Sequence, residues 1–336
     1  MMRHSPLPFL VPLLLAGCDG VQSISGNDGR QGEIVSGLFW IFLAVTIIVY
    51  AIVIAFLVFA LVRRRGRRQD GHADEGELKE KGLKGLLVAW IGATALILLA
   101  LTVATWIGDR RIARAAAAPE LDIEITANQW WWDVRYLSDD PSRIIQTANE
   151  LHLPAGVTAR ISLKSNDVIH SFWVPNLAGK QDLIPGRVSD LSVRPLREGR
   201  YRGQCAEFCG LQHAHMALDV TVESPAAFAA WRQRQSRPAP PPRTPLQLAD
   251  FNYVTTRECA SCHNIAGTPA SGQVAPDLTH FASRRSIGAG TFPMSRGHLY
   301  AWIADPQSAK PGNNMPYVGL EPNELHAIVA YLETLR

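Results

Sequence analysis

The sequence predicts a protein of three parts: a membrane hairpin of two helices, an all-β sandwich, and an all-α domain at the C-terminal end. Two uncharged apolar segments within residues 33–110 predict the hairpin, and short runs of alternating polarity in residues 119–231 predict the sandwich. Helical periodicity in residues 246–336 predicts the last domain. A chain of 336 residues is long enough to form these as separate units.

The first segment, residues 1–18, is typical of an export signal. Arg3 and His4 precede the apolar stretch Phe9–Leu15, and a Leu-Ala-Gly-Cys sequence ends at Cys18. This ending resembles a bacterial lipobox, in which the cysteine is lipidated and becomes the new N-terminus. The alternative is an ordinary signal peptide that is cut nearby, with Cys18 incidental. We predict a signal peptide with a lipobox, and export of the domains in the C-terminal half of the chain.

Two membrane-spanning helices are predicted next. Gly37–Val62 and Leu86–Gly108 contain no charged residue, and each exceeds the roughly 20 residues that cross a bilayer as a helix. The arginine-rich block Arg63–Arg68 and three lysines lie between them, which predicts a cytoplasmic loop. With a net charge of only +3, we interpret the arginine block as a topology signal and not as a nucleic-acid site. Residues 33–110 are therefore expected to form a hairpin in the bacterial inner membrane, with everything after it on the periplasmic face.

The β domain is predicted from period-two runs such as Leu121–Thr126, Ala159–Lys164 and Leu218–Glu223. Turn sequences that contain proline and glycine separate these runs. Short strands at this spacing predict an antiparallel sandwich or barrel over residues 119–231.

A proline-rich linker is predicted over residues 232–245, where five prolines favour an extended spacer. Beyond the linker, Asn323–Leu335 has the periodicity of an amphipathic helix that Pro322 introduces. Its predicted apolar face consists of Leu325, Ile328, Val329 and Leu332. Residues 246–336 are therefore expected to be helical.

A cluster of soft ligands occupies residues 205–216. Cys205, Cys209, His213 and Met216 offer thiolate, imidazole and thioether groups, a set that suits copper, and two thiolates at this spacing can bridge a copper pair. A second imidazole is expected from His170, which ends a strand-like run. Zinc is the alternative, because two cysteines and two histidines also make a tetrahedral site. The added thioether and the sandwich context favour copper.

A second motif, Cys259-Ala-Ser-Cys262-His263, is the attachment signature of a c-type haem. Without the histidine, the two cysteines would also suit a redox dithiol or half of a zinc site. The second axial ligand is expected to be a thioether. We favour Met315, in a loop before the last helix, over Met294.

With these motifs, residues 33–231 resemble subunit II of haem–copper cytochrome c oxidases, in which a two-helix hairpin precedes a cupredoxin domain. Residues 246–336 resemble a class I cytochrome c, so the whole chain is similar to the caa-type subunit II with a fused cytochrome. The resemblance implies a dinuclear CuA centre. Its ligands would be the bridging thiolates Cys205 and Cys209, the imidazoles His170 and His213, the weak axial thioether Met216, and the carbonyl of Glu207.

The resemblance also implies roles for residues outside the ligand set. The Glu207 carboxylate would reach a magnesium ion at the boundary with subunit I, and Trp130 would lie over the copper site as the entry point for electrons. Structural packing is the alternative for the tryptophans of this run. The carbonyl of Pro276 would accept a hydrogen bond from His263, whereas His215 falls outside the copper pattern.

The expected function is therefore that of the electron-transfer subunit of a terminal cytochrome c oxidase, which is not catalytic alone. Electrons from a cytochrome c or an upstream respiratory complex would pass through haem c and CuA to the haem–copper site of subunit I. There O2 would be reduced to water, coupled to proton translocation. Subunit III is an expected further partner, and nucleic acid is not. A nitrous oxide reductase-like protein and a copper-delivery protein are the alternatives; the hairpin argues against the first and the covalent haem against the second.

Overall fold

The computed structural model describes residues 20–69, 80–116 and 118–336. The chain divides into two compact units, one formed by residues 33–114 and the other by the remaining described residues. The predicted signal peptide and lipobox, with Cys18, lie outside the described residues.

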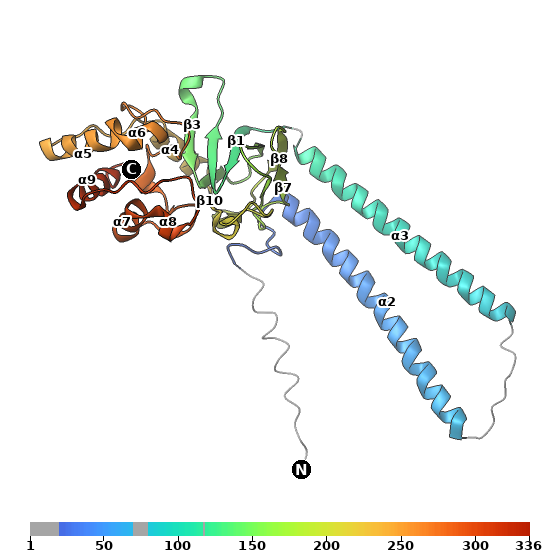
Figure 1. Ribbon diagram of the computed structural model, residues 1–336. Coiled ribbons are helices and arrows are strands. Elements are labelled where there is room, and N and C mark those ends of the chain that lie inside the picture. Colours follow the sequence, from blue (N-terminus) through green and yellow to red (C-terminus); the bar gives the residue numbers. More distant parts are fainter. Residues whose placement is uncertain (1–19, 70–79, 117) are drawn as a thin grey trace, which may run out of the picture. The chain divides into compact units, whose positions relative to one another are not determined.

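The first unit consists of two long helices, α2 (Arg30–Gln69) and α3 (Glu80–Ala116), which Figure 1 shows in blue and cyan. Both are long and apolar enough to cross a membrane, and their apolar side chains face outward instead of into a protein core. Helices that are apolar all round and unburied are typical of membrane spans. Thr46, Thr94 and Thr102 donate their hydroxyl groups to the carbonyl four residues earlier, which satisfies these polar groups within the helix. The predicted hairpin helices are confirmed.

The larger sheet of the sandwich has the strand order β3-β2-β1-β5-β8. Its strands are β1 (Leu121–Asn128), β2 (Trp131–Tyr136), β3 (Ile145–Ala148), β5 (Ala159–Ser165) and β8 (Ser189–Val193). The smaller sheet contains β4 (Glu150–Pro154), β10 (Ala217–Glu223) and β9 (Gly199–Gln204), in the order β4-β10-β9. The strands β6 (His170–Phe172) and β7 (Gln181–Leu183) pair separately.

The sheets are mixed, so the expectation of a purely antiparallel sandwich is wrong. Strand β5 runs parallel to β1, and β10 runs parallel to β4. The physical reason is the route of the chain. After β3 the chain forms β4 in the other sheet and then returns, so that β5 lies beside β1 in the same direction. Alternating polarity reports the buried face of a strand and carries no information about the direction of its neighbour.

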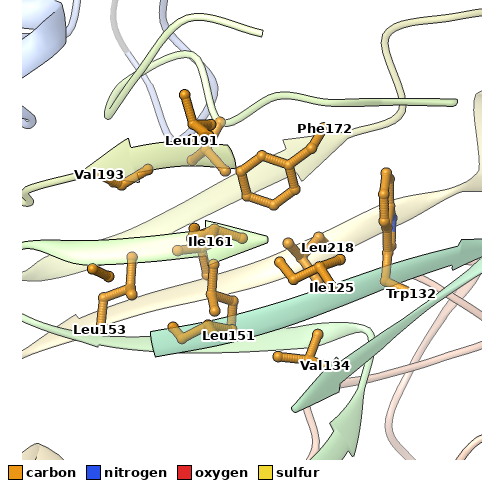
Figure 2. Close-up of a cluster of buried hydrophobic side chains, with 14 of the residues drawn as sticks. Ile125, Trp132, Val134, Leu151, Leu153, Ile161, Phe172, Leu191, Val193 and Leu218 are labelled. Carbon is orange, nitrogen blue, oxygen red and sulfur yellow. The ribbon is translucent and has the colours of Figure 1, made fainter. Parts of the chain in front are cut away.

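Apolar side chains from both sheets meet in a single core (Figure 2), where Ile125, Ile161 and Leu218 lie between the layers. In β1 every second residue is buried, as the sequence pattern predicts. Burying each of these large aliphatic side chains stabilises the fold by about 1.5–3 kcal/mol. The sandwich is therefore a stable platform for the loops at its ends.

The segment from Gly20 to Gln31 also belongs to this unit. Asn176 accepts a hydrogen bond from the Ser23 amide (2.8 Å) and donates one to the Gly20 carbonyl (3.1 Å). The Arg202 amide donates to the carbonyl of Val21 (2.8 Å), so this segment runs along β9. No sequence pattern predicted this attachment.

The rest of the chain is mostly helical. Helix α4 (Pro225–Gln235) closes the sandwich, because Trp231 packs 5.0 Å from the Tyr136 ring. Residues 238–243 form neither helix nor strand, and Ala239 is buried against the last domain, donating its amide to the carbonyl of Ala266. The helices that follow are α5 (Pro245–Thr256), α6 (Glu258–Cys262), α7 (Arg296–Ala304), α8 (Pro306–Ala309) and α9 (Pro322–Leu332).

Helix α9 confirms its sequence prediction. Pro322 occupies its first turn, and Glu321 and Glu324 form a reciprocal capping box. Ile328, Val329 and Leu332 are buried in the core of the helical domain. Shorter elements complete the fold: η1 (Pro141–Arg143), η2 (His213–His215), η3 (Phe281–Ser283), β11 (Ser286–Ile287) and β12 (Phe292–Pro293).

Candidate metal centres

The loop between β9 and β10 carries the soft ligands. Both strands pair antiparallel, and the Cys205 amide donates to the Met216 carbonyl (3.0 Å), which closes the loop at its base. At its tip, Gly210 has a φ of +111°, and a Cβ there would lie only 3.1 Å from the Trp130 ring. A glycine is therefore required, and the loop is folded tightly over this ring.

Within this loop and β6, the predicted copper ligands come together. The Cys205 and Cys209 sulfur atoms are 3.8 Å apart, and His170 Nδ1 lies 3.8 Å from Cys205 Sγ. His213 Nδ1 lies 3.6 Å and Met216 Sδ 4.0 Å from Cys209 Sγ. The remaining predicted ligand atom, the carbonyl oxygen of Glu207, is 3.2 Å from Cys205 Sγ.

These residues fit a copper pair in their donor chemistry. His170, Cys205 and Cys209 are buried, and one donor atom from each lies within 4.8 Å of the other two. Hydrogen bonding to the Cys209 thiol and, less strongly, to the His170 imidazole outweighs burial and lowers the pKa of Cys205 to about 3. Contact with Cys205 raises the pKa of Cys209, and burial adds to this effect. One thiolate is thus favoured by the protein alone, and a bound cation is needed to deprotonate the second.

Two residues that support the ligands were not anticipated from the sequence. Asp167 Oδ1 lies 2.8 Å from His170 Nε2, which leaves Nδ1 to face Cys205. Burial lowers the pKa of His170, but the hydrogen bonds to Asp167 and Cys205 outweigh it, so the pKa is raised. Gln129 Nε2 donates to the Cys209 carbonyl (2.7 Å). The position of Asp167, three residues before a candidate ligand, is the signal that could have identified it.

The three tryptophans have different positions. Trp130 is buried and donates its indole N–H to the carbonyl of Cys209 (2.9 Å), so its ring lies over the ligand loop as expected. Trp132 is also buried, and it packs edge-on against His170 and Phe172 as part of the core. Trp131 is only partly buried. The alternative of structural packing therefore holds for Trp132.

Two other predicted residues lie at the edge of the cluster. The Glu207 carboxylate is partly exposed, 3.9 Å from the amino group of Lys180. His215 is exposed and its Nδ1 lies 2.9 Å from the side-chain oxygen of Gln212, so it stands outside the ligand set, as expected. The carboxylate thus points to a mixed-charge surface and not into the sulfur cluster.

The haem motif forms helix α6 and the residue that follows it. Cys259 and Cys262 are free thiols, available for thioether bonds. His263 Nδ1 lies 2.7 Å from the Pro276 carbonyl, which confirms the predicted hydrogen bond. Burial lowers the pKa of His263. The neutral ring, with Nδ1 donating to the carbonyl, leaves Nε2 free to bind iron. These residues therefore fit a covalent haem.

Met315 and Met294 differ in their surroundings. Met315 lies in the loop after α8, where Gln307 Nε2 donates to its carbonyl (2.8 Å) and its amide donates to Asn313 (2.8 Å). Met294 packs against the core of the helical domain. The interactions of the described residues include none between Met315 and His263, so their pairing as axial ligands stays a prediction.

Comparisons with known proteins match the two domains that carry these centres. Residues 122–223 match the family described as cytochrome c oxidase subunit II, periplasmic domain, and residues 252–336 match the cytochrome c family. Cytochrome c oxidase subunit 2 of Alkalihalophilus pseudofirmus is 31% identical, and the match covers 99% of this chain and 97% of that protein. Cytochrome c oxidase subunit 2 of Bacillus subtilis is 28% identical over 100% of this chain and 99% of the relative.

Among solved structures, the periplasmic domain of cytochrome oxidase subunit II from Bradyrhizobium japonicum is 27% identical. It covers 36% of this chain and 96% of that chain, with a TM-score of 0.33. The family assignment rests on the sequence relatives, which match nearly the full length of both chains. This protein, with its sulfur–imidazole cluster and its haem motif in one chain, belongs to the cytochrome c oxidase subunit II family.

Proposed function

We propose that this chain is the electron-accepting subunit of a bacterial terminal oxidase and holds a dinuclear CuA centre and a covalent haem c. When bound, these two groups supply the uptake and release of single electrons. The electrons would come from a cytochrome c or an upstream respiratory complex and go to subunit I, where O2 is reduced to water with proton translocation. The observation that carries the proposal is the convergence of two thiols, two imidazoles and a thioether beside Trp130 in a chain that also carries the haem motif.

At the copper centre we assign Cys205 and Cys209 as bridging thiolates, because their sulfur atoms lie together between the two imidazoles. His170 and His213 would each hold one copper, since His170 faces Cys205 and His213 faces Cys209. Met216 and the Glu207 carbonyl would be the weak ligands. Burial of His170, Cys205 and Cys209 excludes water from the sulfur atoms and limits reorganisation during electron transfer.

At the haem, Cys259 and Cys262 would form the thioether bonds and His263 would bind the iron. The Pro276 carbonyl holds the His263 ring in the tautomer that leaves Nε2 unprotonated. Met315 would be the second axial ligand, which raises the reduction potential relative to a second imidazole.

Trp130 would admit electrons to the copper centre, because its indole N–H is hydrogen-bonded to the carbonyl of a bridging cysteine. The Glu207 carboxylate would hold magnesium at the boundary with subunit I. Its exposure and its position directly beside the ligand carbonyl support this assignment. Subunit III is a further proposed partner. We place the chain in the inner membrane with a lipidated Cys18.

Metal and haem analysis of the purified oxidase tests the proposal. The wild-type complex should contain two coppers in this subunit for each covalent haem, and His213→Ala should lose copper while keeping the haem. His215→Ala is the matched control, because this exposed neighbour lies outside the ligand set, and its copper content should be unchanged. Zinc in place of copper, or a polypeptide without covalent haem, would contradict the proposal.

A further inference from the structure

Lys310 is a buried lysine whose amino group lies between the sandwich and the helical domain. It follows α8, and only 2% of its surface is exposed. Its Nζ donates to the carbonyls of Trp130 (2.8 Å) and His215 (2.7 Å) in the sandwich, and to Gly288 (2.9 Å) in its own domain. One side chain therefore joins the helical domain to the copper loop and to the β1–β2 turn that carries Trp130.

Such a contact is costly unless every donor is used. Removing an ammonium group from water is unfavourable by several kcal/mol, and here no carboxylate is among the acceptors. Burial lowers the pKa of Lys310 to about 7. Three carbonyl oxygens match the three N–H groups of the protonated amine, so the site is saturated in its bonding. An apolar side chain would fill the same space at lower cost, but it would not fix the orientation of the two domains.

The residues after Lys310 continue the contact. Gln212 Nε2 donates to the carbonyl of Pro311 (2.8 Å). Gly312 lies against the Trp130 ring, since a Cβ added there would be 3.6 Å from the ring carbon Cη2. The same loop reaches Met315 three residues later. The segment between Lys310 and the proposed axial methionine is therefore packed on Trp130.

Contacts on other elements hold the same arrangement. The Ala217 amide, at the end of the copper loop, donates to the carbonyl of Ala289 (2.9 Å). Arg284 is buried in the helical domain, with its Nε 3.8 Å from Glu150 of the sandwich. The helical domain is thus docked on the sandwich by backbone and charged contacts, and Trp130 is only 7% exposed as a result of both the ligand loop and this docking.

We propose that Lys310 is a positioning residue that docks the haem domain on Trp130 in one orientation, so that electrons pass within the chain from the haem domain to the copper domain. The inference rests on the proposed function for the roles of Trp130 and Met315. Lys310 itself binds no metal. The loop from Lys310 to Met315 is the internal contact surface for electron transfer.

The test uses the assembled oxidase with Lys310→Met, which keeps the length of the side chain and removes its donors. Lys164→Met is the matched control, because Lys164 pairs with Glu124 on the face of the larger sheet. Loss of even one hydrogen bond to a charged group should change the docking equilibrium by at least about tenfold. Hydrogen exchange of the Ala217 amide, whose bond crosses the interface, should be at least about tenfold faster in Lys310→Met.

A second readout is the rate of electron transfer from haem to copper after laser-flash photoreduction. We expect it to fall about tenfold or more in Lys310→Met and to be unchanged in Lys164→Met. The haem potential and the copper spectrum should stay as in the wild type, whereas general damage to either domain would shift one of them. If hydrogen exchange and electron transfer in Lys310→Met are as fast as in the wild type, the positioning role of Lys310 is overturned.

Two further outcomes separate this inference from the proposed function. If the wild-type haem does not reduce the copper at all, the proposed function fails. If Lys310→Met does not assemble, hydrogen exchange in the wild-type oxidase tests the docking instead. Strong protection of the Ala217 amide would support the docked arrangement, and exchange at the rate of an unstructured peptide would overturn it.

Discussion

The two metal-binding regions differ in how much of each site is built by the polypeptide. The proposed copper ligands converge on one loop and one short strand, at the end of a sandwich with a buried apolar core (Figure 2). The proposed haem residues come from α6, from the segment around Pro276 and from the loop of Met315. The haem cysteines are only partly buried. We therefore expect the sandwich to preorganise its site and the helical domain to depend on the group that it binds.

This difference has a physical origin in the sizes of the two cores. The sandwich buries large side chains such as Trp132, Tyr136 and Phe172 in its core. The helical domain has fewer fully buried side chains, and Cys259 and Met294 pack only at the edge of its core. A small domain buries a smaller share of its surface and gains more from a covalently attached apolar group.

The largest expected effect follows from removing the haem attachment. Cys259→Ala with Cys262→Ala should unfold the helical domain. Without the attached haem, we expect the free energy of unfolding to fall on the order of 5 kcal/mol, which is the whole stability of a small domain. Cys209→Ser should leave the sandwich folded without copper. Limited proteolysis of the purified oxidase measures both. Equal resistance of the helical domain with and without its cysteines would mean that both domains fold independently of their cofactors.

The second prediction concerns the two methionines of the helical domain. Met315→Ala should lower the haem reduction potential on the order of 100 mV, because axial ligands control most of the potential range of haems. Met294→Ala is the control and should change mainly stability, because this side chain packs against the core. Redox titration of the haem absorbance measures the potential. A large shift in Met294→Ala alone would reverse the assignment.

A smaller effect on copper binding is expected from Asp167, the residue that orients the proposed ligand His170. Asp167→Asn weakens the hydrogen bond that orients His170, so copper affinity should fall about 10- to 100-fold. Asp190→Asn is a matched control, since Asp190 accepts a hydrogen bond from Ser162 on the sheet surface. Competition with a copper chelator measures the affinity. Unchanged affinity in Asp167→Asn would show that the loop alone orients the histidine.

The smallest effect concerns pH and a buried cluster at the interface of the sandwich with the helical domain. Burial lowers the pKa of His152, but bonds to Glu150 and Glu223 outweigh it, and the pKa is raised above 6.5. Burial raises the pKa of Glu150, but His152 and Arg284 outweigh it and lower the pKa below 4.5. The stabilisation from His152 is complete below pH 6.5 and is lost as the pH rises through its folded pKa. That from Glu150 is complete above pH 4.5 and is lost on acidification.

The cluster should therefore stabilise the protein most between pH 4.5 and 6.5. Thermal unfolding followed from pH 6 to 8 should show a loss of roughly 2–4 °C in the wild type that is smaller in His152→Gln. His298→Gln is a control, because His298 lies in an exposed part of the helical domain. Identical pH profiles of thermal unfolding for the wild type and His152→Gln would show that this cluster does not control the pH dependence of stability.

Much of the architecture could be predicted because its signals are local. Alternation in Leu121–Thr126 identified the buried face of β1, and the spacing of Cys259, Cys262 and His263 identified the haem motif. The parallel pairing of β1 with β5 could not be predicted, because the alternation of polar and apolar residues does not report which strands are neighbours or in which direction they run. Lys310 was missed for a related reason: it meets Trp130 across 180 positions of sequence, and no local pattern reports such a contact.

One chain should hold a preorganised copper pair beside a covalent haem. Electron paramagnetic resonance of the oxidase, purified with its subunits, tests it most directly. Hyperfine structure from one unpaired electron shared equally by two copper nuclei is the predicted result. It should be lost in Cys209→Ser while the haem signal persists. Hyperfine structure from a single copper, or a site filled with zinc and silent, would contradict the account.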